Sequence, residues 1–322
     1  MAEDRYMRIA RTLGQRASAE KVLNALAAEG IPVIVFKGLT LRERVYDTPH
    51  QRMMHDLDFL VRQADFEKAA HIIQSLGYAF TPGDKEYTFE FARRYMGEVQ
   101  YRKGFVYIDL HWSLTAMGWY RLTTNFNLEQ LWERAVPTKI GGAPACRLCT
   151  VDEIIHLCYH TAVHHGLAHG PSYRDIQGVL RVQGEGVDWL ELAQCARNWR
   201  VSTAVWSALS VLRNQDAAVV PGVVLADFGV PKWRRALLKP IINRVQKREQ
   251  MLTSGTMRFM AVLLVDRWRD LPAALLKGLF PGKQWLKTRF DLPDSQVIGK
   301  LVSYPFEVIW NGVRAVLTLP FG

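Results

Sequence analysis

The sequence predicts an α+β protein in which an N-terminal domain with a mixed sheet precedes a mostly helical C-terminal domain. Short apolar runs rich in β-branched residues alternate with amphipathic stretches up to about residue 112, which is typical of a sheet with covering helices. After Pro137 the apolar residues recur mainly at helical spacing, and prolines separate the stretches. We therefore expect two domains, over residues 1–135 and 136–322.

The elements of the first domain follow from the same two patterns. Ala, Leu and Ile recur at helical spacing among charged residues over 3–29, and Gly30 ends this predicted helix. The β-branched run over 32–36 predicts a buried strand. Further along the chain, the patterns predict a helix at 39–46, a turn at 47–50, a strand at 57–61 and a helix at 65–76.

The last part of the first domain, residues 86–112, has the alternating pattern of antiparallel strands, and we expect their turn at Lys103-Gly104. In the second domain, Thr150-Val-Asp-Glu153 has the form of a capping box ahead of an apolar run, which predicts the start of a helix. The final residues, Leu301–Gly322, are apolar but interrupted by charges. This favours a packed or interfacial helix over a transmembrane span.

Composition and charge narrow the class of protein. The 322 residues are 49% hydrophobic and 22% charged, which excludes a disordered or fibrous chain. The net charge of +10 resides in residues 231–322, which contain 16 Lys and Arg against 6 Asp and Glu. Such a basic region suits phosphates, nucleic acid or an anionic membrane, or is a solvated helical face. Four cysteines and a charged N-terminus without an apolar signal core favour the cytoplasm.

Three carboxylates stand out in the predicted strands. Asp56 and Asp58 flank a single residue at the start of one strand, so both side chains point to the same face. Asp109 lies within another strand among apolar residues, where an unpaired carboxylate is costly to bury. We expect Mg²⁺ or Mn²⁺ as the partner, because hard divalent cations prefer carboxylate and phosphate oxygens. Three such carboxylates suit a pair of metal ions and in-line displacement at phosphorus.

A positively charged turn precedes these acids. Phe36-Lys37-Gly38 ends one strand and opens a helix, so the glycine backbone can approach a phosphate while Lys37 and the helix N–H groups offer positive charge. The sequence thus predicts one segment that binds phosphates and another that binds metals.

The order of these motifs resembles that of a known family. An apolar strand ending in Lys37-Gly38 is followed by Tyr46, Arg52, Asp56-Leu-Asp-Phe-Leu-Val61 and Ile108-Asp-Leu-His-Trp112. The later segments His156–His160, Tyr173–Ile176, Phe280-Pro and Trp285–Arg289 fit the same pattern. On these residues the chain resembles the bacterial uncharacterised nucleotidyltransferases, within the superfamily that has a DNA polymerase β-like core. The resemblance spans most of the chain and is most specific from Lys37 to Val61.

This resemblance implies an activity. The N-terminal domain would be catalytic, and the helical domain would bind the acceptor. A nucleoside monophosphate would pass from a nucleoside triphosphate such as ATP to a hydroxyl or phosphate of a small-molecule or peptide acceptor. The resemblance also implies a role in natural-product or polysaccharide tailoring.

The resemblance implies the site residues as well. Asp56, Asp58 and Asp109 would hold the metals, and Asp109 is also available to take the acceptor's proton. Many members of the superfamily carry Gly-Gly or Gly-Ser at the phosphate-binding turn, whereas Leu39 here offers no hydroxyl. The phosphate contacts are therefore assigned to Lys37, Gly38, Thr40 and Arg52.

Several alternatives stay open. A related enzyme on the same scaffold would transfer a phosphoryl or glycosyl group from a nucleotide donor. A catalytically degenerate copy would be a binding module that uses its basic C-terminal region, and nucleic acid is a less favoured partner. His111 faces the same way as Asp109 and is either a site residue or a hydrogen-bonded structural one. The sequence indicates neither the oligomeric state nor the preferred base.

A group of histidines invites a different interpretation. His156, His160 and His164 recur at four-residue intervals on a predicted helix, just after Cys146-Arg-Leu-Cys149. Such residues bind zinc, but no second Cys-x-x-Cys and no His-Glu-x-x-His accompanies them. We therefore interpret the histidines as a helix stripe that packs against the catalytic domain.

Overall fold

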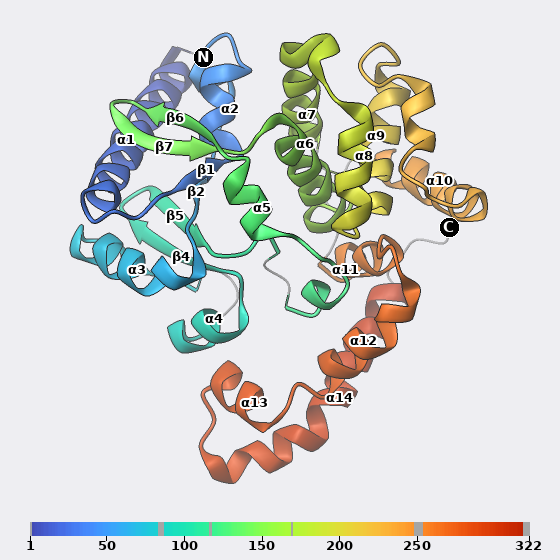
Figure 1. Cartoon of the computed structure of the whole chain (residues 1–322). Helices are drawn as coiled ribbons and strands as arrows, with labels where there is room; N and C mark the ends of the chain where they lie inside the picture. Colours follow the sequence, from blue (N-terminus) through green and yellow to red (C-terminus); the bar gives the residue numbers. More distant parts are fainter. Residues whose placement is uncertain (1, 83–86, 116–117, 169, 248–253, 318–322) are drawn as a thin grey trace. The chain divides into compact units, whose positions relative to one another are not determined.

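The computed structural model describes residues 2–82, 87–115, 118–168, 170–247 and 254–317. The chain forms two compact units. Unit 1 contains Met1–Gly118 and Leu128–Cys149, and unit 2 contains Trp119–Asn127 and Thr150–Gly322. Unit 1 holds a sheet with covering helices and unit 2 is a helical body (Figure 1). The predicted α+β class with a helical C-terminal region is confirmed.

A seven-stranded mixed sheet forms the centre of unit 1. Its strands are β1 Ile34–Phe36, β2 Asp56–Leu60, β3 Ala79–Phe80, β4 Glu98–Lys103, β5 Val106–His111, β6 Val136–Ile140 and β7 Ala143–Arg147. Their order across the sheet is β3-β4-β5-β2-β1-β7-β6. β1 is antiparallel to β2 and parallel to β7, and β2 is parallel to β5. β1 and β2 lie in the middle of the sheet, which agrees with the burial of most of their residues.

The helices of unit 1 are α1 Ala2–Ala28, α2 Gly38–Arg44, α3 Phe66–Ser75, α4 Phe89–Tyr95 and α5 Leu128–Glu133. α1 contacts β7 of the sheet and also α3. Its buried side chains include Ala19, Val22, Leu23 and Leu26, and their spacing is that of one face of a helix. The predicted first helix, first two strands and 65–76 helix are therefore confirmed, with ends shifted by a few residues.

The prediction of strands throughout 86–112 is wrong at its beginning. Residues 89–95 form α4, because the Thr88 hydroxyl accepts a hydrogen bond from the Phe91 N–H and caps the helix. The hairpin that follows is confirmed, but its turn is Gly104-Phe105, since Lys103 pairs with Val106. Gly104 has a φ of 58°, which suits a two-residue hairpin turn.

The β6–β7 hairpin extends the sheet beyond the boundary expected at residue 135. β7 pairs in parallel with β1, and the Cys146 N–H donates to the Val33 carbonyl at 2.8 Å. This pairing keeps Leu128–Cys149 in unit 1, and the helices of unit 2 begin at Thr150. The change to helical structure, which the sequence predicts after Pro137, thus occurs after this hairpin, at Thr150.

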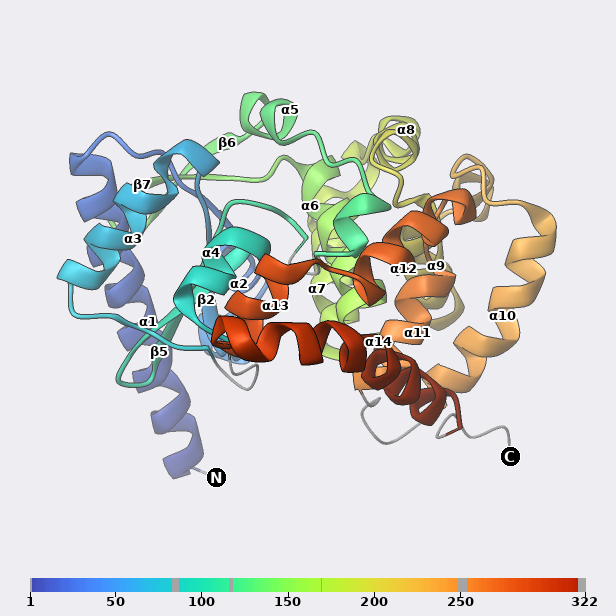
Figure 2. The ribbon, with the colours of Figure 1, turned by 90° about the horizontal axis from the view of Figure 1, so that it is seen from below.

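Unit 2 is built around α6, Thr150–Tyr159, which is buried along its whole length. α6 contacts α7 Gly170–Gln183, α8 Trp189–Asn198 and α9 Ser202–Gln215, as Figure 2 shows from below. Its buried residues include the polar Asp152, Glu153 and His156 beside apolar side chains. The remaining helices are α10 Lys232–Gln246, α11 Ser254–Leu263, α12 Leu271–Leu279, α13 Lys283–Phe290 and α14 Asp294–Leu317.

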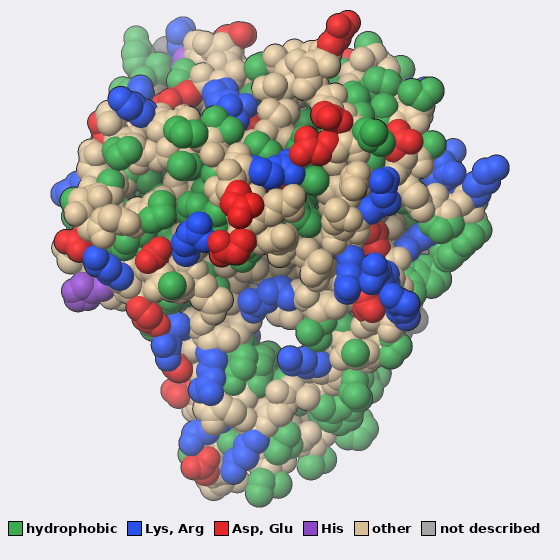
Figure 3. Space-filling model, viewed as in Figure 1, with side chains coloured by type: hydrophobic (Ala, Val, Ile, Leu, Met, Phe, Trp, Pro, Cys, Tyr) green, Lys and Arg blue, Asp and Glu red, His purple; other side chains and the backbone are tan. Residues whose placement is uncertain are grey.

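The expected packed or interfacial helix at Leu301–Gly322 is found as part of α14, and residues 318–322 lie outside the described residues. None of the helices that the structure describes is long and apolar enough to cross a membrane. α14 exposes a row of large apolar side chains, Ile298, Val302, Phe306 and Trp310 among them. Hydrophobic side chains gather over this part of the surface in Figure 3.

A buried arginine fixes the segment that leads into β2. Arg42 of α2 is 1% exposed. Its Nε donates to the Arg52 carbonyl at 2.6 Å, and its Nη2 donates to Gln15 Oε1 at 2.9 Å. Gln15 in turn donates to the Met54 carbonyl at 3.2 Å. Burial and the neighbouring arginines lower the pKa of Arg42 to about 10, so it stays charged at neutral pH.

This network predicts that Arg42→Met destabilises unit 1. The substitution leaves two buried acceptors without their charged donor, so we expect the free energy of unfolding to fall by about 2–4 kcal/mol in urea titrations. Arg16→Met is the matched control, because Arg16 forms a partly exposed ion pair with Glu43 at 3.1 Å. Equal effects of the two substitutions would contradict the structural role of Arg42.

Candidate active site

The three predicted acids lie on neighbouring strands in the middle of the sheet. In the parallel pairing of β2 with β5, Asp58 lies beside Asp109. Asp56 shares the face of Asp58, because side chains alternate along a strand and the two residues are two positions apart. The structure therefore brings Asp109 next to two acids that are distant from it in sequence.

Asp58 is the most enclosed of these acids, with 3% of its surface exposed. Its Oδ1 accepts a hydrogen bond from Lys37 Nζ at 2.6 Å and lies 3.1 Å from His111 Nε2. Burial by itself disfavours a carboxylate. Lys37 and His111 outweigh this effect and hold the pKa of Asp58 well below its ordinary value. Asp58 is therefore ionised at neutral pH.

Lys37 reaches Asp58 from a strained backbone. It precedes α2 with φ 55° and ψ −132°, a conformation that residues other than glycine rarely adopt and that costs on the order of 1–3 kcal/mol. Its Nζ also lies 5.2 Å from the centre of the Phe36 ring. Burial opposes the charge on Lys37, but Asp58, Asp56 and Glu98 together raise its pKa. The strain is thus linked to a buried ion pair at the end of β1.

His111 connects two carboxylates on the same face. Its Nε2 faces Asp58, and its Nδ1 lies 3.3 Å from Glu98 Oε2. Its ring packs edge-on against Phe36, with centroids 5.0 Å apart. Burial opposes protonation of this imidazole, yet the hydrogen bond to Asp58 and the charge of Glu98 raise its pKa. Each ring nitrogen thus faces a carboxylate oxygen, an arrangement that favours the protonated imidazole.

Asp109 has a different environment from Asp58. Its Oδ1 accepts a hydrogen bond from Gln100 Nε2 at 2.8 Å. Burial, followed by the charges of Glu98, Asp56 and Asp58, raises the pKa of Asp109 to about 8. Adjacent acids in one cluster therefore differ in protonation, since Asp58 is ionised and Asp109 holds its proton at neutral pH.

The cluster as a whole contains more acidic side chains than cationic ones. Burial and the nearby Asp58 raise the pKa of Asp56, which lies half-buried at the start of β2. When all groups are charged, four carboxylates face two cationic side chains: Asp56, Asp58, Glu98 and Asp109 against Lys37 and His111. A divalent cation would balance this difference, and the donor set of carboxylate oxygens is the one that Mg²⁺ and Mn²⁺ prefer.

The geometry agrees with a site for such an ion. Among the described residues, one group of acidic, histidine or cysteine side chains has ligand atoms within 4.8 Å of one another, namely Asp58, Asp109 and His111. Both nitrogens of His111 face carboxylates, so the oxygens of Asp58 and Asp109 are the ligand atoms of this group that suit a hard cation. Asp56 lies outside that group, but its carboxylate points to the same face. The residues therefore fit a hard divalent cation.

The predicted phosphate-binding turn has a packing role in the structure. Met54 fills the space in which a side chain at Gly38 would lie. The Thr40 hydroxyl donates to the Lys37 carbonyl at 3.2 Å, and Thr40 is 3% exposed. Of these turn residues, Lys37 is the one that the structure joins to the acids.

Arg52 lies in the loop between the short helical turn Pro49–Gln51 and β2. Its Nη1 donates to the Met53 carbonyl, and its own carbonyl accepts from Arg42. The loop that carries Arg52 is thus held by Arg42, next to the strand that carries Asp56 and Asp58.

The histidines of unit 2 do not form a metal group of three or more ligands within the part of the chain that the structure describes. His156 is buried in α6, and His160 stacks on His164 with centroids 4.7 Å apart. His160 Nε2 also lies 3.1 Å from His165 Nε2. His156 lies in α6, and His160 and His164 lie in the π-helical turn His160–His164 that follows it. The interpretation of these residues as a structural stripe rather than a zinc site stays a prediction.

Two residues of the cluster were missed in the sequence. Glu98 lies opposite His111 and Gln100 lies opposite Asp109 in the β4–β5 hairpin. The register of that hairpin could have predicted their positions, because a two-residue turn at Gly104-Phe105 fixes which residues of the two strands face each other. The expected turn at Lys103-Gly104 shifts this register and conceals the pairing.

Comparison with known proteins finds one matching family model and similar solved structures. Residues 1–214 match the family model described as "Uncharacterised nucleotidyltransferase", and no curated protein matches the chain. The solution structure of the antibiotic-resistance factor ANT(2'')-Ia is similar at 12% identity and a TM-score of 0.38, over 64% of this chain and 95% of that one. An antigenic nucleotidyltransferase-like protein from Paracoccidioides brasiliensis has 12% identity and a TM-score of 0.40, over 66% and 92% of the two chains.

The raised pKa of Asp109 predicts a pH dependence of stability. A carboxyl whose pKa rises on folding favours the folded state fully below its unfolded pKa of about 4, and this contribution is lost as the pH rises through about 8. Asp109→Asn keeps an acceptor for Gln100 and cannot ionise. In EDTA, the parent should therefore lose stability relative to this variant between pH 5 and 9, by up to about 4 kcal/mol. A constant difference in unfolding free energy over this range would show that Asp109 is not buried among carboxylates.

Proposed function

Because the chain belongs to the uncharacterised nucleotidyltransferase family and is thus a nucleotidyltransferase by class, we propose that it transfers a nucleoside monophosphate from a nucleoside triphosphate to a hydroxyl or phosphate acceptor. The observation that carries this proposal is the excess of carboxylates over cations around Asp58 and Asp109. A polyanionic substrate would add to that excess, so the reaction needs divalent metal.

In this proposal Asp56, Asp58 and Asp109 hold Mg²⁺ or Mn²⁺. When bound, such ions neutralise the phosphate charge and stabilise the attacking and leaving oxygens during in-line displacement. Lys37 and His111 keep Asp58 ionised before any substrate arrives. Asp58 is thus ready to coordinate without first losing a proton.

Asp109 has a second proposed role. In the metal-free protein, burial and the neighbouring carboxylates raise the pKa of Asp109 to about 8, so a bound metal would first displace its proton and leave a carboxylate. We assign Asp109 to accept the proton of the acceptor's hydroxyl, with Gln100 fixing the orientation of its carboxylate through the 2.8 Å hydrogen bond.

The phosphates would lie against the positive end of the site. We propose that Lys37 and Arg52 supply positive charge to the triphosphate. Gly38 and Thr40 would act indirectly, because Gly38 makes room for Met54 and Thr40 holds the Lys37 carbonyl. ATP is the proposed donor, and a small molecule or peptide is the proposed acceptor. A reducing compartment such as the cytoplasm suits the chain, since its four cysteines are free thiols.

The proposal predicts metal-dependent nucleotide binding that requires Asp56. The four nucleoside triphosphates are screened by thermal shift with Mg²⁺, with Mn²⁺ and with EDTA, because a ligand that binds the folded state raises the melting temperature. For at least one triphosphate we expect a larger rise with metal than in EDTA, and this metal-dependent rise is the readout for the acidic cluster. Asp56→Asn should abolish the rise, whereas the control Asp47→Asn, at an exposed site outside the cluster, should keep it.

Product analysis separates the remaining alternatives. The mass added to an acceptor differs among a nucleoside monophosphate, a phosphate and a hexose, so it distinguishes nucleotidyl, phosphoryl and glycosyl transfer. If Asp56→Asn matches the parent in nucleotide binding and in turnover, the catalytic proposal fails. The chain would then be a binding module.

A further inference from the structure

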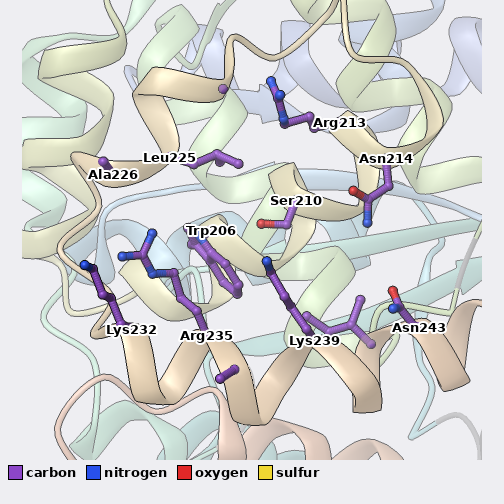
Figure 4. Close-up of a pocket in the computed structure, with 13 residues that line it drawn as sticks. Trp206, Ser210, Arg213, Asn214, Leu225, Ala226, Lys232, Arg235, Lys239 and Asn243 are labelled. Atoms are coloured by element: carbon purple, nitrogen blue, oxygen red, sulfur yellow. The ribbon is translucent and has the colours of Figure 1, made fainter.

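A basic hollow of about 710 Å³ lies wholly within unit 2, between α9, the short helix Gly222–Ala226 and α10. Its volume is in the range of small-molecule sites, about 300–1,000 Å³. Figure 4 shows Arg213 of α9 on one side and Lys232, Arg235 and Lys239 of α10 on the other. No acidic side chain lines the hollow among the residues that the structure describes. It shares no residue with the acidic cluster of unit 1.

The rotation of α10 about its axis is fixed by the neighbouring Arg234. This side chain is 4% exposed and donates to the carbonyls of Asp266, at 2.8 Å, and of Leu263, at 3.1 Å. Its guanidinium also lies 4.9 Å from the centre of the Trp268 ring. Arg234 thus fixes one side of the helix in the core of unit 2. The residues at positions 232, 235 and 239 are on another side, where they face the hollow.

The alignment of these cations is unfavourable in the free protein. Lys232, Arg235 and Lys239 are spaced three and four residues apart, so they are neighbours along one helix face, and like charges at this spacing repel. Within the described chain, none of the three has an ion-pair or hydrogen-bond partner. Arg213, from the opposite wall, donates to the Val220 carbonyl at 3.1 Å. An anion bound between the walls would relieve the repulsion.

Two buried polar atoms in the same hollow also lack partners. Trp206, 2% exposed, has no acceptor for its Nε1–H, and the buried Ser210 Oγ has no hydrogen bond in the described structure. Both residues line the hollow, where Ser210 lies between Trp206 and Lys239 in Figure 4. A buried donor without a partner costs about 1–3 kcal/mol. A ligand with several acceptor oxygens would satisfy these donors together with the cations.

We propose that this hollow binds a small ligand that carries a pyrophosphate group, such as a nucleoside di- or triphosphate. Two linked phosphates match the spacing of cations along α10, and the wall formed by Trp206 and Leu225 offers an apolar surface to the rest of the ligand. A small ligand fits better than a nucleic acid, because the charges converge in one hollow rather than along a strip. Since no carboxylate lines the hollow, binding needs no divalent metal. This site therefore differs in chemistry from the proposed catalytic one.

The test is calorimetric titration of the full-length chain with inorganic pyrophosphate and with ATP, both in EDTA. The metal chelator removes the metal-dependent binding expected at the acidic cluster, so the two sites are measured separately. We expect one saturable site per chain. Arg235→Gln with Lys239→Gln should weaken it at least tenfold, and Ser210→Ala should weaken it severalfold. The matched control, Lys277→Gln with Lys283→Gln, removes the same charge from exposed positions outside the hollow and should change affinity less than twofold.

The outcomes separate a binding role from a structural one. If the two cations bind anions, the ligand-free Arg235→Gln, Lys239→Gln variant should melt at or above the temperature of the parent, because a repulsion is removed. The proposal is overturned if neither pyrophosphate nor ATP binds saturably in EDTA, or if the control pair weakens binding equally. It is also overturned if a single-stranded oligonucleotide binds through these residues while pyrophosphate does not.

Discussion

The buried contact of Asp58 with Lys37 and His111 is the constraint on which the rest of unit 1 depends. It joins the end of β1 to β2 and β5, which carry Asp56, Asp58, Asp109 and His111. A buried carboxylate with one partner removed would be strongly destabilising, so each cation is required once Asp58 is in place. The contact also creates the difference between adjacent acids, since Lys37 and His111 both contact Asp58, whereas Asp109 accepts a hydrogen bond from the neutral Gln100. An ionised acid and a protonated acid therefore lie side by side.

This arrangement links the local strain at Lys37 to chemistry. The positive φ of Lys37 turns the chain from β1 into α2 at the point where its side chain must return to Asp58. The same turn brings Gly38 against Met54, and Arg42 of α2 holds the loop before β2. The packing of Gly38 against Met54 thus helps to position the charged side chain of Lys37 beside Asp58. Family membership agrees with this emphasis, because the matched residues 1–214 include the whole cluster.

Local patterns in the sequence were sufficient for most elements of unit 1, and the failures have physical reasons. Helical spacing identified α1, and short apolar runs identified β1 and β2. The segment around Phe89 alternates like a strand, but the Thr88 cap decides for a helix. The β6–β7 hairpin joins unit 1 through a pairing with β1 that no local pattern reveals.

The site was also predictable only where local patterns in the sequence determine it. Alternation along β2 was enough to place Asp56 and Asp58 on one face. That β5 pairs with β2, and so brings Asp109 to Asp58, depends on contacts between distant segments. The position of Glu98 in the site follows from the register of the β4–β5 hairpin, which the turn expected at Lys103-Gly104 would shift. The contact of Lys37 with Asp58 requires an unusual backbone angle at Lys37.

The most direct test of the account is anomalous diffraction from crystals grown with Mn²⁺ and a non-hydrolysable triphosphate. The account predicts an anomalous peak about 2.1 Å from carboxylate oxygens of Asp56, Asp58 or Asp109, with the triphosphate on the Lys37 side. A crystal that contains the nucleotide but has no manganese at this cluster would contradict the central claim.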